Sequence, residues 1–161
     1  MPPTLLFLGD LDERHGIDLL LRAMPTILRH HPQTRLFVSG DGPLAEPLAA
    51  YCRYLQLEEG VAFVPPPSMA DVDVVIVPGR QAVPPDAFDA ARLAGKPVVA
   101  THEAASEWAE HEIDALLVYP SENAIAAAVV RLLDDPELMR KLGEAGHRRL
   151  PAGRDAPISP S

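Results

Sequence analysis

The sequence predicts an α/β fold: a single Rossmann-like domain with a doubly wound parallel sheet of about six strands. Short runs that are apolar without alternation recur along the chain, which is typical of strands buried on both faces. Between them lie segments whose apolar residues recur at helical spacing. This alternation implies right-handed crossovers, and the length of 161 residues fits one domain of ordinary size.

Six apolar runs are the expected strands, at residues 5–8, 36–39, 61–64, 74–77, 97–100 and 115–118. The segment after the first run carries one apolar helix face, made of Ile17, Leu20, Leu21, Met24, Ile27 and Leu28. The segment after the second run carries another, made of Leu44, Leu48, Cys52 and Leu55. For this fold we expect the strand order 3-2-1-4-5-6, with a ligand crevice where the order reverses.

The third crossover is unusually short. Residues 65–73 begin with three prolines and leave room for one helical turn at best, so we expect the sheet to be less well covered there. The chain then ends in two helices, at about 123–133 and 136–149, the second with Asp135 as N-cap and Pro136 at its first position. We expect the domain to span residues 1–150 and residues 151–161 to form a disordered tail.

Composition excludes several classes of protein. The net charge is -9, from 14 basic and 23 acidic residues, and this field repels nucleic acid. No run approaches the roughly 18 apolar residues of a membrane span, and no secretory signal is visible, so we expect a cytoplasmic protein. Cys52 is the only cysteine and the six histidines have no metal-binding spacing, so neither a disulfide, a metal nor a cofactor is predicted.

Residues 77–101 are the most informative segment. They read V-P-G-R-Q-A-V-P-P-D-A-F-D-A-A-R-L-A-G-K-P-V-V-A-T. This text resembles the nucleotide-sugar segment of a family 4 (group 1) glycosyltransferase of the two-domain GT-B fold, P-S-x-x-E-P-F-G-L-x-x-L-E-A-M-A-x-G-K-P-V-V-A-T. Both acidic positions of the family's E-x7-E motif are alanines here, Ala82 and Ala90. The resemblance implies that contacts to the donor sugar and ribose are lost.

The loop after the first expected strand continues the resemblance. Residues 8–16, L-G-D-L-D-E-R-H-G, are similar to the family's L-G-R-L-x-x-x-K-G, whose Arg and Lys hold the donor diphosphate. Asp10 stands at the Arg position and His15 at the Lys position, so an attraction for phosphate becomes a repulsion. Arg14 and the helix-start amides after the loop remain as possible anion contacts.

A glycine-rich turn and two acids complete the candidate site. Residues 40–43 match the family's G-[DE]-G-P turn, and the glycine at position 40 indicates fold more than function. Asp86 and Asp89 have the spacing of a helix N-cap with an acidic partner, although a role in ligand binding stays open. The family's Gly-Gly loop appears as residues 104–107, A-A-S-E, without glycine. No catalytic residue is assigned, and the candidate ligand-binding residues are Gly9, Asp10, Arg14, His15, Gly40, Arg80, Ala82, Asp86 and Ala90.

The resemblance covers residues 4–150 and only the donor-binding half of such an enzyme. One hypothesis is a subunit or fragment of a split transferase, which binds a UDP- or GDP-linked sugar weakly and is completed by a partner chain with the acceptor domain. The other is a non-catalytic binding or scaffold domain derived from a glycosyltransferase. A remote alternative is a haloacid dehalogenase-like phosphatase, because Asp10 and Asp12 follow the first strand.

Overall fold

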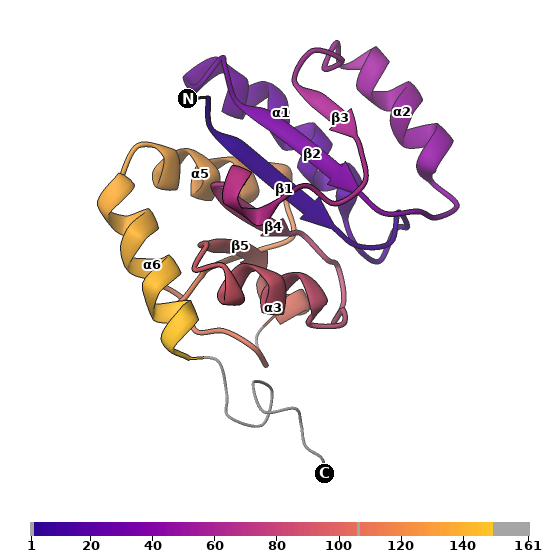
Figure 1. The fold of residues 1–161 in the computed structure, drawn as a ribbon. Coiled ribbons are helices and arrows are strands. Elements are labelled where there is room, and N and C mark those ends of the chain that lie inside the picture. Colours follow the sequence, from indigo (N-terminus) through magenta and orange to yellow (C-terminus); the bar gives the residue numbers. More distant parts are fainter. Residues whose placement is uncertain (1, 106, 150–161) are drawn as a thin grey trace.

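Six parallel strands form one sheet in the order β3-β2-β1-β4-β5-β6 in the computed structural model, which describes residues 2–105 and 107–149 (Figure 1). The strands are β1 Thr4–Leu8, β2 Arg35–Ser39, β3 Val61–Phe63, β4 Val74–Val77, β5 Val98–Thr101 and β6 Leu116–Val118. The parallel sheet and its strand order are as predicted, and each strand lies within one residue of its predicted bounds. The order reverses between β1 and β4, which are direct neighbours.

Helices cover both faces of the sheet. The helices are α1 Ile17–His30, α2 Ala45–Tyr54, the single 3₁₀ turn η1 Met69–Asp71, α3 Asp86–Leu93, α4 His102–Ala105, α5 Glu122–Leu133 and α6 Pro136–Arg148. Leu5 and Phe7 of β1 pack in one core with α1, α2 and α5, whereas Leu6 between them packs in the other core with α3 and α4. This alternation is why consecutive residues within each strand are apolar.

The short crossover is confirmed, since η1 is one turn of 3₁₀ helix between β3 and β4. Phe37 on β2 lies in the same core as Met69 of η1 and is only half-buried, which is the incomplete cover that the sequence predicted. At the other end of the chain, the carboxylate of Asp135 accepts a hydrogen bond from the amide of Leu138 at 3.0 Å and caps α6 as predicted. The predicted tail, residues 151–161, lies outside the described residues.

A buried ion pair joins α3 to the segment before β6. A guanidinium nitrogen of Arg92 lies 3.0 Å from a carboxylate oxygen of Asp114, and both side chains are at most 5% exposed. Arg92 also donates to the carbonyl of Trp108, and Asp114 accepts from the amide of Glu110.

Within the described ranges, no helix is both long and apolar enough to cross a membrane.

Candidate functional site

The loops after β1 and β4 meet at the point where the strand order reverses, as expected. Gly16, at the end of the first loop, has a φ of +73°, and a Cβ placed on it would lie 1.9 Å from the carbonyl oxygen of Pro78. The amide of Arg80 donates to the carbonyl of Arg14 at 2.8 Å. The two loops are therefore in direct backbone contact, and only glycine fits at position 16.

The loop after β1 is also joined to the loop after β2. The amide of Gly9 donates to Ser39 at 3.1 Å, and the amide of Leu11 donates to Asp41 at 2.9 Å. Gly40 has a φ of +150°, and a Cβ there would lie 1.8 Å from the carbonyl oxygen of Gly9. Gly9 and Gly40 thus hold the two loops together, in agreement with the structural role predicted for the glycine-rich turn.

His15 points into its own loop. Its Nδ1 lies 2.7 Å from the Oδ1 of Asp12, its backbone amide donates to the same oxygen at 2.9 Å, and the residue is 8% exposed. Partial burial raises the pKa of Asp12, but the hydrogen bonds from His15 outweigh this and hold that pKa below its usual value. Asp12 is therefore ionised at neutral pH and holds the imidazole ring of His15 in place.

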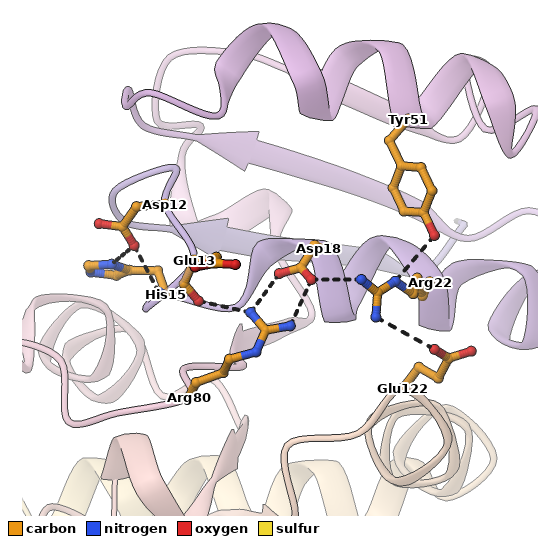
Figure 2. A network of polar contacts seen from close by, with 8 residues as sticks. All are labelled: Asp12, Glu13, His15, Asp18, Arg22, Tyr51, Arg80 and Glu122. Atoms are coloured by element: carbon orange, nitrogen blue, oxygen red, sulfur yellow. Dashed lines mark hydrogen bonds and ion pairs between the residues drawn. The ribbon is translucent and has the colours of Figure 1, made fainter.

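Arg80 is held by an acidic residue that sequence analysis missed. Figure 2 shows its guanidinium in a two-point ion pair with Asp18 of α1, at 2.8 and 2.7 Å, while it also donates to the carbonyl of Glu13 at 2.9 Å. Burial raises the pKa of Asp18, but the hydrogen bond and charge of Arg80 outweigh it and lower that pKa. We call the Arg80–Asp18 pair the latch, because it fastens the loop after β4 to α1.

The latch continues along α1. Asp18 also accepts from Arg22 at 3.0 Å, and Arg22 donates to the hydroxyl of Tyr51 on α2 at 3.2 Å (Figure 2). The spacing of Asp18 and Arg22, four residues apart on a helix, was a signal for this pair in the sequence. Nothing in the sequence pointed to Arg80 as the third member, since it lies 62 residues from Asp18.

Of the remaining candidates, Asp10 lines the crevice, whereas Arg14, Ala82 and Ala90 are not among its lining residues. Asp10, Arg14 and Ala82 are exposed and Ala90 is half-buried. No side-chain hydrogen bond or ion pair is seen for Asp10 or Arg14 within residues 2–105 and 107–149. The structure therefore brings Asp10 and His15 to one loop and leaves Arg14 pointing to solvent.

The capping role predicted for Asp86 is wrong. Pro85 is the N-cap residue of α3 and Asp86 is the first helical residue, so its carboxylate makes no cap hydrogen bond. The two prolines before it set the backbone for a helix start one residue earlier than the Asp-x-x-Asp spacing indicated. Asp86 and Asp89 still lie in the first turn, where their charges favour the helix dipole. Asp86 is among the residues that line the crevice.

Two cavities open at the carboxyl ends of the strands. The crevice between the loops after β1 and β4 holds only about 150 Å³ and is lined in part by Asp10, His15 and Asp86. A larger cleft of about 900 Å³ lies beyond β1, β2 and β3, and Asp10 and Asp86 line it too. Ligand sites usually hold about 300 to 1,000 Å³, so only the larger cleft has the size of one.

One group of side chains has the composition of a metal site. Potential ligand atoms of Asp10, Asp12 and His15 all lie within 4.8 Å of one another, and this is the one such group in the described part of the chain. Asp12 and His15 already bond to each other, which competes with a cation.

Further along the chain, Ala104 and Ala105, expected in a loop, belong to the short helix α4. Alanine favours that helical conformation where the family's glycines favour a loop.

Comparisons with known proteins agree with this fold. The family model described as "Glycosyl transferases group 1" matches residues 2–135. An uncharacterized glycosyltransferase of Methanocaldococcus jannaschii is 32% identical over 140 residues, which is 81% of this chain and 36% of the relative. A GDP-mannose-dependent phosphatidylinositol monomannoside mannosyltransferase of Mycolicibacterium smegmatis is 31% identical over 160 residues, covering 89% of this chain and 42% of the relative.

Solved structures show the same architecture. The C-terminal domain of a group 1 glycosyltransferase from Francisella tularensis superimposes with a TM-score of 0.80 at 19% identity, over 92% of this chain and 85% of that one. An Anabaena protein solved in complex with UDP and glucose gives a TM-score of 0.80 at 22% identity, over 91% of this chain and 43% of that one. The chain spans less than half the length of the curated relatives named above. Nothing in these comparisons supports the phosphatase alternative.

Proposed function

Because this chain belongs to the group 1 glycosyltransferases, we propose that it is a donor-side domain that does not turn over a nucleotide-sugar by itself and acts as a binding domain. One observation carries this proposal. Arg80 in the loop after β4 is held by Asp18, and Asp10 in the loop after β1 lines the crevice. A donor diphosphate entering this crevice meets a negative charge and no free guanidinium on its lining.

The energetic argument follows from the latch. Hydrogen bonds between charged groups are worth up to about 1.5 to 3 kcal/mol each and less where solvent screens them; Arg80, whose side chain is 34% exposed, makes two of them to Asp18. A diphosphate that recruited Arg80 would have to break them and leave Asp18 with Arg22 alone. Arg14 at the surface is a weak substitute, because an exposed cation is well screened.

A second candidate is a subunit of a split transferase that binds a UDP- or GDP-linked sugar and is completed by a partner chain. Two observations favour it: the curated relatives named above are more than twice as long as the matched part, and the six-stranded donor-side sheet is complete. Their names describe transfer reactions of whole proteins. In both candidates the net charge of -9 argues against nucleic acid as a partner, and we propose a cytoplasmic location.

Calorimetric titration with UDP, GDP, UDP-glucose and GDP-mannose separates the two candidates. The binding-domain proposal expects no saturable heat at millimolar nucleotide. Saturable binding of any of the four would overturn it and favour the split transferase, whose activity should then appear when the partner chain is added.

A gain-of-binding variant tests whether the side chains at positions 10 and 15 are what prevents nucleotide binding. Asp10→Arg combined with His15→Lys restores the two cations at the positions where the family has them, and we expect measurable affinity for UDP. The matched control is Asp71→Arg with His30→Lys, which makes the same charge changes at exposed positions outside the crevice lining. An equal gain in both variants would mean that net charge, and not the crevice, controls nucleotide binding. No gain in either would show that the crevice is closed by its size.

A further inference from the structure

The larger cleft at the ends of β1, β2 and β3 combines an apolar floor with an acidic lining. We call it the acidic cleft. Its apolar lining includes Leu8, Val38, Ala45, Ala49, Val64 and Pro65. Its charged lining residues are Asp10, Asp41, Glu46 and Asp86, and neither Lys nor Arg is among the residues that line it. In Figure 1 this region lies at the arrowhead ends of β1 and β2.

The four carboxylates are available to a ligand. All four residues are exposed, and no hydrogen bond or ion pair of their side chains is seen among residues 2–105 and 107–149. Elsewhere on the surface, acids such as Asp18 and Glu137 are paired with arginine. A concave surface with one sign of charge concentrates oppositely charged ligands, because the low-dielectric walls focus the field.

The walls of the acidic cleft are fixed before any ligand arrives. The backbone hydrogen bonds between the loops after β1 and β2 hold Asp10 and Asp41 in place, and Leu44 donates to the carbonyl of Leu11 at 3.0 Å to anchor the start of α2. Glu46 follows two residues later in the first turn of that helix. Because the backbone holds these positions, binding here does not have to order the loops.

We propose that the acidic cleft binds a segment of a partner protein in which lysine or arginine alternates with apolar side chains. Such a segment places its apolar side chains on the floor and its cations beside the carboxylates. Its charge is opposite to that of a nucleotide diphosphate, and the volume of about 900 Å³ holds several side chains. The inference rests on the proposed function, since it names what the domain binds in place of a donor.

A divalent cation is the competing occupant, and the geometry favours the peptide. A metal ion needs several oxygen or nitrogen ligands at one point, whereas the acidic residues of the cleft come from the loops after β1 and β2 and from the first turns of α2 and α3. The one compact group in the described part of the chain, Asp10 with Asp12 and His15, is partly self-bonded. A metal would also leave the apolar floor uncovered.

Three capped hexapeptides test both halves of the proposal by calorimetry: alternating lysine and leucine, alternating lysine and serine, and alternating glutamate and leucine. We expect saturable binding of the lysine and leucine peptide, binding weakened at least about tenfold for the lysine and serine peptide, and none for the acidic one. Raising the salt concentration from about 0.05 to 0.5 M should weaken the first peptide several-fold. Equal binding of both lysine peptides would overturn the role of the apolar floor.

Matched variants locate the site. Asp41→Asn with Glu46→Gln should weaken the lysine and leucine peptide at least about threefold, whereas Glu58→Gln with Glu59→Gln removes the same charge at the exposed segment before β3 and should not. Equal effects of the two pairs would overturn the proposal. It would also be overturned by displacement of the peptide by submillimolar Mn²⁺, because that result assigns the cleft to a metal ion. If neither the peptide nor the nucleotides bind, this inference alone is overturned. Saturable binding of UDP would instead overturn the proposed function.

Discussion

Replacing Gly16 by alanine tests the contact between the two loops that define the crevice. A φ of +73° costs a residue with a Cβ about 1 to 2 kcal/mol. The new Cβ would also lie 1.9 Å from the carbonyl oxygen and 2.7 Å from the carbonyl carbon of Pro78, so the loop after β4 must move by more than 1 Å, since Cβ contacts under 3.0 Å are essentially never found. That movement breaks the hydrogen bond between Arg80 and Arg14, worth about 1 kcal/mol.

We therefore expect Gly16→Ala to lower the free energy of unfolding by about 3 kcal/mol or more, which corresponds to a fall in Tm of about 6 to 12 °C. Gly95→Ala is the matched control. Gly95 has a φ of +70°, yet nothing lies within 4 Å of a Cβ placed on it, so only the backbone cost of about 1 to 2 kcal/mol applies. Urea unfolding followed by circular dichroism measures both variants. Equal losses of stability would refute the close approach of the two loops.

Asp18→Asn should cost about 1 to 2 kcal/mol at pH 7, because it leaves Arg80 with a neutral partner. The fold lowers the pKa of Asp18, so its contribution to stability is complete above the unfolded value near 4 and is lost as the pH falls through the lower folded pKa. The difference in stability from the parent should therefore narrow as the pH falls below about 4, and a constant difference would contradict the ion pair. Asp114→Ala should cost about 3 to 5 kcal/mol in urea unfolding, because it strands the buried charge of Arg92, and a loss below about 1 kcal/mol would contradict that. Burial raises the pKa of the Cys52 thiol to about 11, so Ellman's reagent at about pH 8 should react only as fast as the protein opens, and rapid reaction of the native protein would refute this burial.

The sheet could be predicted because its signals are local and redundant. Each strand is a short apolar run, and Asp135 with Pro136 marks a helix start through chemistry confined to a few residues. The position of the crevice followed from the strand order alone. Asp86 shows the limit of local signals, since the same few residues allow a helix start at two neighbouring positions.

The sequence could predict which residues belong to the candidate site but not which of their side chains contact each other. Arg80 was among the predicted ligand-binding residues, and the structure pairs it with Asp18 of α1. No local rule joins two residues 62 positions apart, because their contact depends on how α1 packs beside the loop after β4. His15 illustrates the same limit, since its partner Asp12 is near in sequence but the direction of the ring is set by the fold of the loop.

The two proposals for this domain concern cavities that share Asp10 and Asp86. Asp10 lines both the small crevice and the acidic cleft, as does Asp86. A cation of a partner segment seated beside Asp10 would neutralise the charge that opposes a diphosphate, and linkage requires that the two ligands then favour each other's binding equally. On this reasoning the sign of the charge at position 10, more than the shape of the sheet, decides what this domain binds.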